Sequence, residues 1–88
     1  MTYKVILTAR ARRDLESSLP PAAAAAVMEF IRGPLADNPH RVGQALRSPR
    51  LGQYSARRGE YRMIYTIDED AITVTVITMR HRRDAYRS

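Results

Sequence analysis

The sequence predicts an α+β fold in which a helical hairpin packs on one face of a small antiparallel sheet. Three observations predict it: a β-branched run near the start, two helical patterns joined by a pair of prolines, and strand patterns separated by turn residues towards the end. The expected order of elements is β-α-α-β-β-β. At 88 residues the chain has room for one small core, so a single domain over residues 1–88 is expected.

The first strand and the first helix are expected to follow each other directly. Residues 3–8, YKVILT, have the β-branched and aromatic side chains that are typical of strands. Thr8 is a suitable helix N-cap, because its hydroxyl can accept a hydrogen bond from a backbone N–H of the first turn. A helix is therefore expected over residues 9–18, with Ala11 and Leu15 at i+4 spacing on one side.

A second helix completes the hairpin. Proline is tolerated only in the first turn of a helix, so Pro20 and Pro21 are expected to end one helix and begin the next. The new helix is expected over residues 21–32, where apolar residues have the spacing of one buried face. Gly33 and Pro34 are expected to end or kink it.

A loop and three strands are expected in the rest of the chain. Asn38-Pro39 indicates a loop, and residues 35–49 are long for a connection in a small domain, which is typical of a functional or mobile segment. Strands are expected over residues 51–57, 61–67 and 71–80. Residues 58–60 and 68–70 have the composition of the turns between them.

Alternation along the expected strand over residues 61–67 divides its side chains between two faces. Four residues share the face that is expected to be core: Tyr61, Met63, Tyr65 and Ile67. Arg62 therefore points away from the core, near the start of this strand. Because antiparallel pairing places the end of one strand beside the start of its neighbour, Arg62 is expected to converge with the basic segment that ends the last strand. That segment contains Arg80, His81, Arg82 and Arg83.

Arginine dominates the charge of the chain. Fifteen Lys and Arg residues against nine Asp and Glu residues give a net charge of +6, and fourteen of the fifteen are arginine. Residues 41–62 carry a net +5 and residues 80–88 a net +3, so the remainder is −2. A basic excess confined to two segments predicts a binding face, and the planar fork of arginine is suited to pairing with two phosphate oxygens at once.

The residue types that are missing exclude several classes of protein. Without cysteine there is no disulfide scaffold, zinc–thiolate site or thiol nucleophile. No apolar run is long enough to span a membrane and no secretory signal precedes the first strand, so a cytoplasmic protein without membrane contact is expected. Because only two histidines occur and the acidic residues 68–70 have the pattern of a solvated turn, no metal site and no cofactor are expected.

The residues that are expected to converge suit a phosphodiester. Arginines would neutralise its non-bridging oxygens and the charge that grows in a pentacovalent transition state. Histidine is the side chain suited to proton transfer at neutral pH, so His81 could serve as an acid or base, whereas Tyr86 could stack on a base or hydrogen-bond the phosphate. RNA can be cleaved without a metal when its own 2′-hydroxyl attacks the adjacent phosphate, an option that DNA lacks. The composition therefore favours RNA chemistry or nucleic-acid binding over a metal-dependent nuclease.

Two motifs are fairly specific in combination: R-x-G-x-Y-R-x-x-Y at residues 57–65 and H-R-x-x-x-Y at residues 81–86. With them, the chain resembles the RelE branch of the RelE/ParE toxin superfamily over essentially its whole length. The resemblance implies the toxin of a bacterial type II toxin–antitoxin pair, which enters the ribosomal A site and cuts mRNA there without a metal, leaving a cyclic phosphate. It also implies a RelB-like antitoxin as the cognate partner, in an oligomeric complex.

The resemblance also implies roles for individual residues. Arg62 and Arg82 are similar to the arginines that hold the transition-state phosphate, and Tyr86 to the tyrosine that stacks on a base. His81 is expected to serve as the acid or base. Four further basic residues within or directly beside the two motifs are expected to bind RNA: Arg57, Arg58, Arg80 and Arg83.

One departure from the RelE pattern leaves the identity of the base open. Two lysine positions of the best-known RelE toxins fall at Gln53 and Ser55, neither of which is a base at neutral pH. Two alternatives to the endoribonuclease therefore stay open. One is a ParE-type poison of DNA gyrase, and the other is a non-catalytic module that binds nucleic acid through its arginines.

Overall fold

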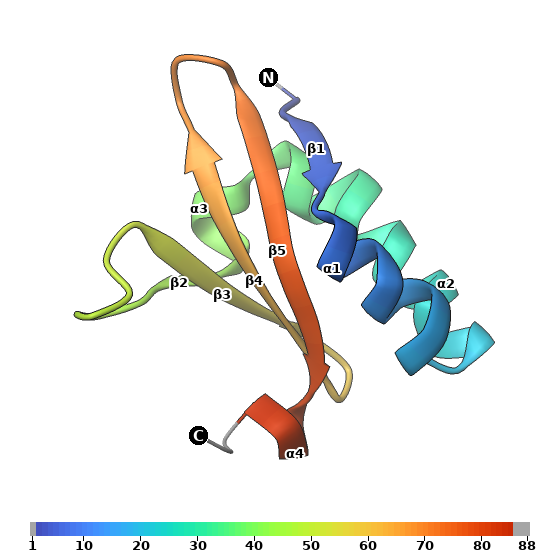
Figure 1. Cartoon of the computed structure of the whole chain (residues 1–88). Coiled ribbons are helices and arrows are strands. Elements are labelled where there is room, and N and C mark those ends of the chain that lie inside the picture. The colour runs from blue at the N-terminus through green and yellow to red at the C-terminus, as the bar shows by residue number, and fades with distance from the viewer. Residues whose placement is uncertain (1, 86–88) are drawn as a thin grey trace.

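The molecule is a five-stranded sheet with helices behind it and along one edge (Figure 1). The computed structural model describes residues 2–85, with side chains as far as Arg83. Its elements in chain order are β1 (Lys4–Leu7), α1 (Ala9–Arg13), α2 (Pro21–Phe30), α3 (Pro39–Val42), β2 (Gln44–Ala45), β3 (Gln53–Arg58), β4 (Tyr61–Asp68), β5 (Thr73–His81) and α4 (Arg82–Ala85). The predicted α+β fold, with a helical hairpin on one face of the sheet, is confirmed.

The sheet is mixed rather than wholly antiparallel. Its strand order is β1-β5-β4-β3-β2. The pairs of β5 with β4 and of β4 with β3 are antiparallel as expected, and β3 also pairs in antiparallel with the unexpected strand β2. Strand β1 instead runs parallel to β5, with Lys4 opposite Thr73. The helices and three other strands lie between β1 and β5 in the sequence, so no tight turn forces these two strands to pair in antiparallel.

The first helix begins at the predicted cap and lies against the edge of β5. The backbone N–H of Ala11 donates to the Thr8 hydroxyl at 3.1 Å, and the same hydroxyl donates to the carbonyl of Ile77 at 2.7 Å. One turn further on, a carboxylate oxygen of Asp14 accepts from the Thr78 hydroxyl at 2.9 Å and from the backbone N–H of Met79 at 3.1 Å. The helix continues in a wider π-helical winding over Asp14–Ser18, so the predicted range is confirmed.

The second helix does not end where the sequence predicted. It winds as a π-helix over Ile31–Leu35, straight through Gly33 and Pro34. The wider π-helical turn tolerates the absence of a backbone N–H at Pro34. The buried side chains of Ile31 and Leu35 hold this segment against the core.

The predicted loop contains two short elements. Asn38 caps α3, because its side-chain oxygen accepts from the backbone N–H of Arg41 at 3.3 Å, and Pro39 occupies the first helical position. Strand β2 then pairs with β3, so that Gln44 lies opposite Ser55. The expected strand over residues 51–57 begins two residues later than predicted, since residues 49–52 form turns.

The core face of β4 is the one that alternation predicted. Met63 and Tyr65 are fully buried, and Tyr61 and Ile67 pack against the same cluster. The Tyr65 hydroxyl donates to the buried carbonyl of Pro39 at 2.6 Å, and burial raises the pKa of this tyrosine to about 12. Gly43 lies directly against that hydroxyl, since a Cβ on Gly43 would fall 2.2 Å from it.

A polar cluster closes the end of the sheet at the β4–β5 turn. Glu69 contacts the imidazole of His40 and accepts a 2.9 Å hydrogen bond from Tyr3, and these two contacts lower the pKa of its carboxyl. Asp68 accepts from the backbone N–H of Ala71 at 3.0 Å, as expected of a turn residue. The cluster ties β1 and α3 to this turn.

Within residues 2–85, no helix has the length and apolar character that crossing a membrane requires.

Candidate nucleic-acid interface

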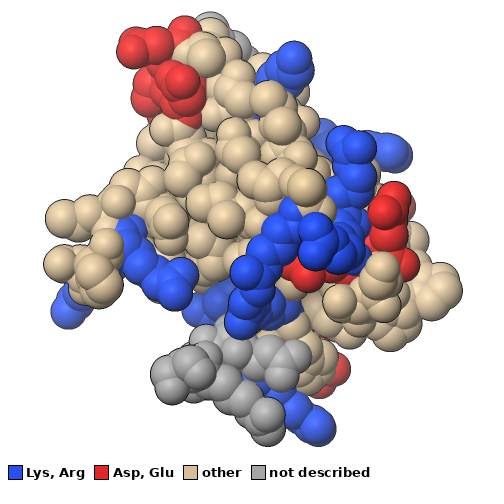
Figure 2. All heavy atoms as spheres, in the orientation of Figure 1, with Lys and Arg blue, Asp and Glu red and all other residues tan. Residues whose placement is uncertain are grey.

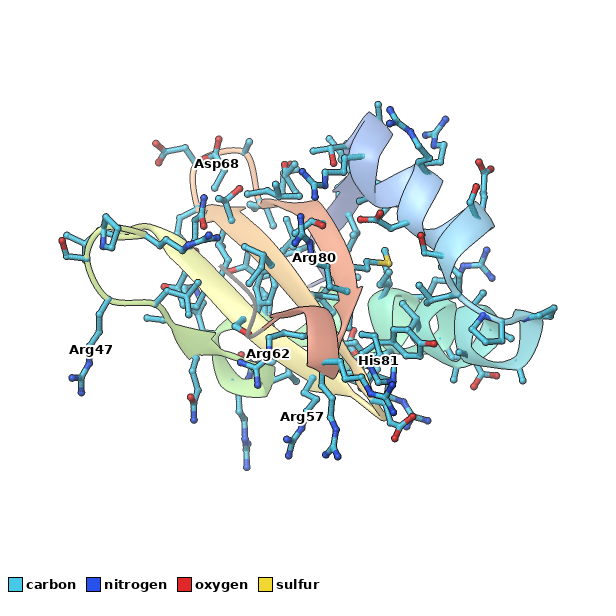
Figure 3. The ribbon with its side chains drawn as sticks, turned by 60° about the horizontal axis from the view of Figure 1, so that its bottom comes forward. Arg47, Arg57, Arg62, Asp68, Arg80 and His81 are labelled. Carbon is cyan, nitrogen blue, oxygen red and sulfur yellow. The ribbon has the colours of Figure 1, made fainter. Side chains whose placement is uncertain are left out.

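The open face of the sheet carries three arginines in one row. Arg57 on β3 lies directly opposite Arg62 on β4, which lies directly opposite Arg80 on β5. Directly opposed residues of an antiparallel pair share a face, and neighbouring strands lie about 4.8 Å apart. Figure 3 labels Arg57, Arg62 and Arg80 on these three adjacent strands. The row therefore crosses three strands at the end of the sheet where β4 begins and β5 ends.

Arg62, the middle member, is held by a neighbour on β3. One of its terminal guanidinium nitrogens donates to the hydroxyl of Ser55 at 3.3 Å. Ser55 is itself 8% exposed, and Arg62 is half-buried. Ser55 occupies one of the two positions where the resemblance places a lysine, so this position contributes a hydrogen-bond partner for Arg62 instead of a charge.

Two hollows flank Arg62 on this face. One, of about 410 Å³, opens towards α1 and is also lined by Arg10, Arg50 and Arg80. The other, of about 480 Å³, opens towards α3 and β2 and is also lined by Arg41 and Arg57. Arg62 lines both hollows. Figure 2 shows several basic side chains across the left and centre of this face, while an acidic group gathers at the top, by the β4–β5 turn.

His81 and Arg58 lie on the other side of the sheet. His81 is directly opposite Tyr61, and the two rings meet edge to face with centroids 5.3 Å apart. Its Nε2 lies 3.4 Å from a carboxylate oxygen of Glu60. Arg58 is also opposite Tyr61 and lines a small hollow against α2. Convergence of Arg62 with Arg80 is confirmed, but His81 reaches the same end of the sheet on the opposite face.

The remaining predicted residues follow β5. Arg82 and Arg83 are exposed in the first turn of α4, and the backbone N–H of Arg82 donates to the carbonyl of Glu60 at 2.7 Å. This bond fixes the start of α4 beside the β3–β4 turn. Tyr86 lies outside the described residues.

Arg10 is a member of this site that the sequence did not indicate, and Ser55 was marked only as a position where RelE toxins have a lysine. Arg10 has the pattern of a solvated helix residue near acidic neighbours, and only the docking of α1 on β5 brings it to the hollow. Ser55 could have been found from alternation, because it lies two residues before Arg57 on the same face of β3. Arg41 and Arg50 belong to the basic segment that composition had already marked.

The row of arginines is expected to reduce the stability of the free protein. Like charges directly opposite on a sheet repel, so we expect Arg80→Gln to raise the free energy of unfolding by about 0.5 kcal/mol at low salt. The gain should shrink in high salt, where the repulsion is screened. Urea unfolding at two salt concentrations measures this, with Arg13→Gln on the exposed side of α1 as the control that shows no gain. A lower stability of Arg80→Gln at low salt would contradict the expectation.

Fold and site together define a class: a small α+β protein whose open sheet face carries a row of arginines. Residues 5–86 match the family model described as "ParE toxin of type II toxin-antitoxin system, parDE". The chain belongs to this family of type II toxins.

Its relatives are toxins as well. The chain is 49% identical over 87 residues to Toxin RelG of Mycobacterium tuberculosis, covering 99% of each chain. It is 48% identical over 85 residues to Toxin RelE of the same organism, covering 97% of this chain and 87% of the relative. The toxin–antitoxin complex RelBE2 from that organism contains a chain of the same fold, with a TM-score of 0.89, 48% identity and coverage of 93% of this chain and all of that one. The resemblance to the RelE/ParE superfamily is confirmed.

Proposed function

We propose that this toxin is an endoribonuclease that cuts mRNA in the ribosomal A site. The observation that carries the proposal is the row of Arg57, Arg62 and Arg80 on an open face with a hollow on each side of Arg62. Such a face can hold single-stranded RNA whose phosphate backbone runs along the row. Relatives named RelG and RelE at about half identity support an RNA target over gyrase.

In the proposed reaction the 2′-hydroxyl of one nucleotide attacks the phosphorus that follows it. The new bond gives a 2′,3′-cyclic phosphate, and the bond to the 5′-oxygen of the next nucleotide breaks. Arg62, held by Ser55, is placed to stabilise the negative charge that grows on the non-bridging oxygens. Arg82 is proposed to assist the leaving group and Tyr86 to stack on a base, both from the resemblance alone.

The resemblance also supports a single domain over residues 1–88 and a cytoplasmic location. A RelB-like antitoxin is the proposed partner, because the related RelBE2 toxin is described as part of a toxin–antitoxin complex. An oligomer with that antitoxin is expected. No metal or cofactor is assigned a role.

Primer extension on a defined mRNA, with purified ribosomes and without them, tests the proposal. We expect cuts only in translated message. Cleaved gyrase–DNA complexes with intact mRNA would instead establish the ParE-type activity, which the name of the family model favours. Binding that weakens steeply with salt and no turnover would establish a non-catalytic module.

The role of His81 as a base is tested by the pH dependence of cutting. Its imidazole contacts Tyr61 and Glu60 on the other face, so we expect His81→Ala to retain cutting within about threefold. The polar side chains that line the two hollows are arginines, hydroxyls and an amide, none of which is a general base at neutral pH. With hydroxide taking the 2′-proton, the logarithm of the single-turnover rate should rise with pH at a slope near one. A plateau in the rate that His81→Ala removes would establish His81 as the base.

A further inference from the structure

The hollow between Arg62 and α1 combines an apolar floor with a cationic rim. Leu46, Ile64 and Ile77 line it as half-buried apolar side chains. Arg10 and Arg80 line it from α1 and from the end of β5. A volume of about 410 Å³ falls in the range of sites that hold small organic ligands. A surface that is apolar in the middle and cationic at the edge matches the base and the phosphate of one nucleotide.

Helix α1 is fixed to β5 on both sides of Arg10. Before it, the backbone N–H of Thr8 donates to the carbonyl of Val76 at 3.0 Å. After it, Asp14 accepts from the Thr78 hydroxyl at 2.9 Å. These bonds hold the first turn of the helix beside the hollow, so the position of Arg10 is set by the scaffold rather than by a flexible loop.

We propose that this hollow binds the nucleotide next to the cut, with its base on the floor of Leu46, Ile64 and Ile77 and its own phosphate on Arg10 and Arg80. The inference rests on the proposed function, because it takes Arg62 to hold the phosphate that is attacked. Arg10 is then a binding residue for a second phosphate. It adds affinity only when the RNA extends beyond the scissile phosphate in the direction of α1.

Arg12 is a matched control for Arg10. Both arginines are exposed on α1, but Arg12 lines a different hollow, beside β1 and α2. Arg10→Gln and Arg12→Gln remove the same charge from the same helix, so any general electrostatic effect is common to both variants. A difference between them measures the local contact.

The test is equilibrium binding of short oligoribonucleotides that carry 2′-O-methyl groups and cannot be cut. A dinucleotide is compared with trinucleotides extended at the 5′ or the 3′ side, by calorimetry on the free toxin at low salt. We expect one extension to raise the affinity about fivefold to tenfold. Arg10→Gln should abolish that gain, and Arg12→Gln should keep it. The slope of log K against log salt should fall by about 0.7, the contribution of one single-strand phosphate, in Arg10→Gln alone.

An abasic residue at the extended position separates a nucleotide site from a phosphate site. We expect the abasic trinucleotide to lose part of the gain, and full retention would overturn the proposed base contact. Equal effects of the two arginine variants, or no gain from either extension, would overturn the subsite. Cutting of translated mRNA is measured separately, so a toxin that cuts without this binding pattern refutes the subsite alone. A toxin that shows the pattern and never cuts refutes the endoribonuclease.

Discussion

Arg62→Ala is expected to reduce mRNA cutting on the ribosome by about 100-fold to 1,000-fold, the range found when one donor to a transition-state oxyanion is removed. Arg62 is the only member of the row that lines both hollows and is held by a buried partner, Ser55. Its removal takes a positive charge away from the point between the two hollows. Single-turnover cleavage at saturating ribosome complex gives the effect on the chemical step.

Two controls accompany this variant. Arg13→Ala removes an exposed arginine of α1 and is expected to cut normally. Arg62→Lys keeps the charge but loses the planar fork, so it should recover only part of the lost rate. The thermal midpoint of Arg62→Ala is measured alongside, because loss of the hydrogen bond to buried Ser55 opposes the relief of repulsion within the row. Wild-type cutting by a folded Arg62→Ala protein would remove this residue from the mechanism.

Gly43→Ala is expected to lower the free energy of unfolding by about 2–4 kcal/mol, from overpacking and from the disturbed hydrogen bond of Tyr65. The added Cβ would lie 2.2 Å from the Tyr65 hydroxyl and 2.8 Å from the carbonyl oxygen of Ser55. The first of these groups is buried and bonded to Pro39, and the second is backbone. Neither can move away without disturbing the packing of β4 or the pairing of β2 with β3.

Gly33→Ala is the matched control, because nothing lies within 4 Å of a Cβ at that position. Alanine is a better helix former than glycine, so this variant should be unchanged or slightly more stable. Tyr65→Phe in the Gly43→Ala background removes the oxygen that the new methyl group meets. We expect the second substitution to cost less in that background than alone, in a urea-unfolding cycle. Equal midpoints for wild type and Gly43→Ala would show that the glycine is not needed.

The elements that follow from local pattern were predictable from the sequence. The helical hairpin depends on the Thr8 cap and the paired prolines, and the two faces of β4 depend on strict alternation. Helix continuation through Pro34 was not predictable, because the buried contacts of Ile31 and Leu35 outweigh a local breaker. The parallel placement of β1 depends on contacts between distant parts of the chain, which no local signal records.

The site divides in the same way. Arg62 and Arg80 could be placed on one face because one follows from alternation and the other from antiparallel pairing. His81 was grouped with these two arginines because all three were expected at the same end of the sheet. Alternation alone would have placed it opposite, since it follows Arg80 by one residue in an extended strand. Arg10 could not be found, because its position depends on how α1 docks on β5.

The position of β5 has a consequence for synthesis of the toxin. This strand lies between β1 and β4 in the sheet, although it is the last of the strands to be translated. Lys4 pairs with Thr73, so β1 has no partner strand until this part of β5 has been synthesised. A nascent chain that lacks residues 73–81 has neither the strand that joins β1 to β4 nor the third arginine of the row. The proposed phosphate-binding row is therefore completed only when the last strand has been added to the sheet.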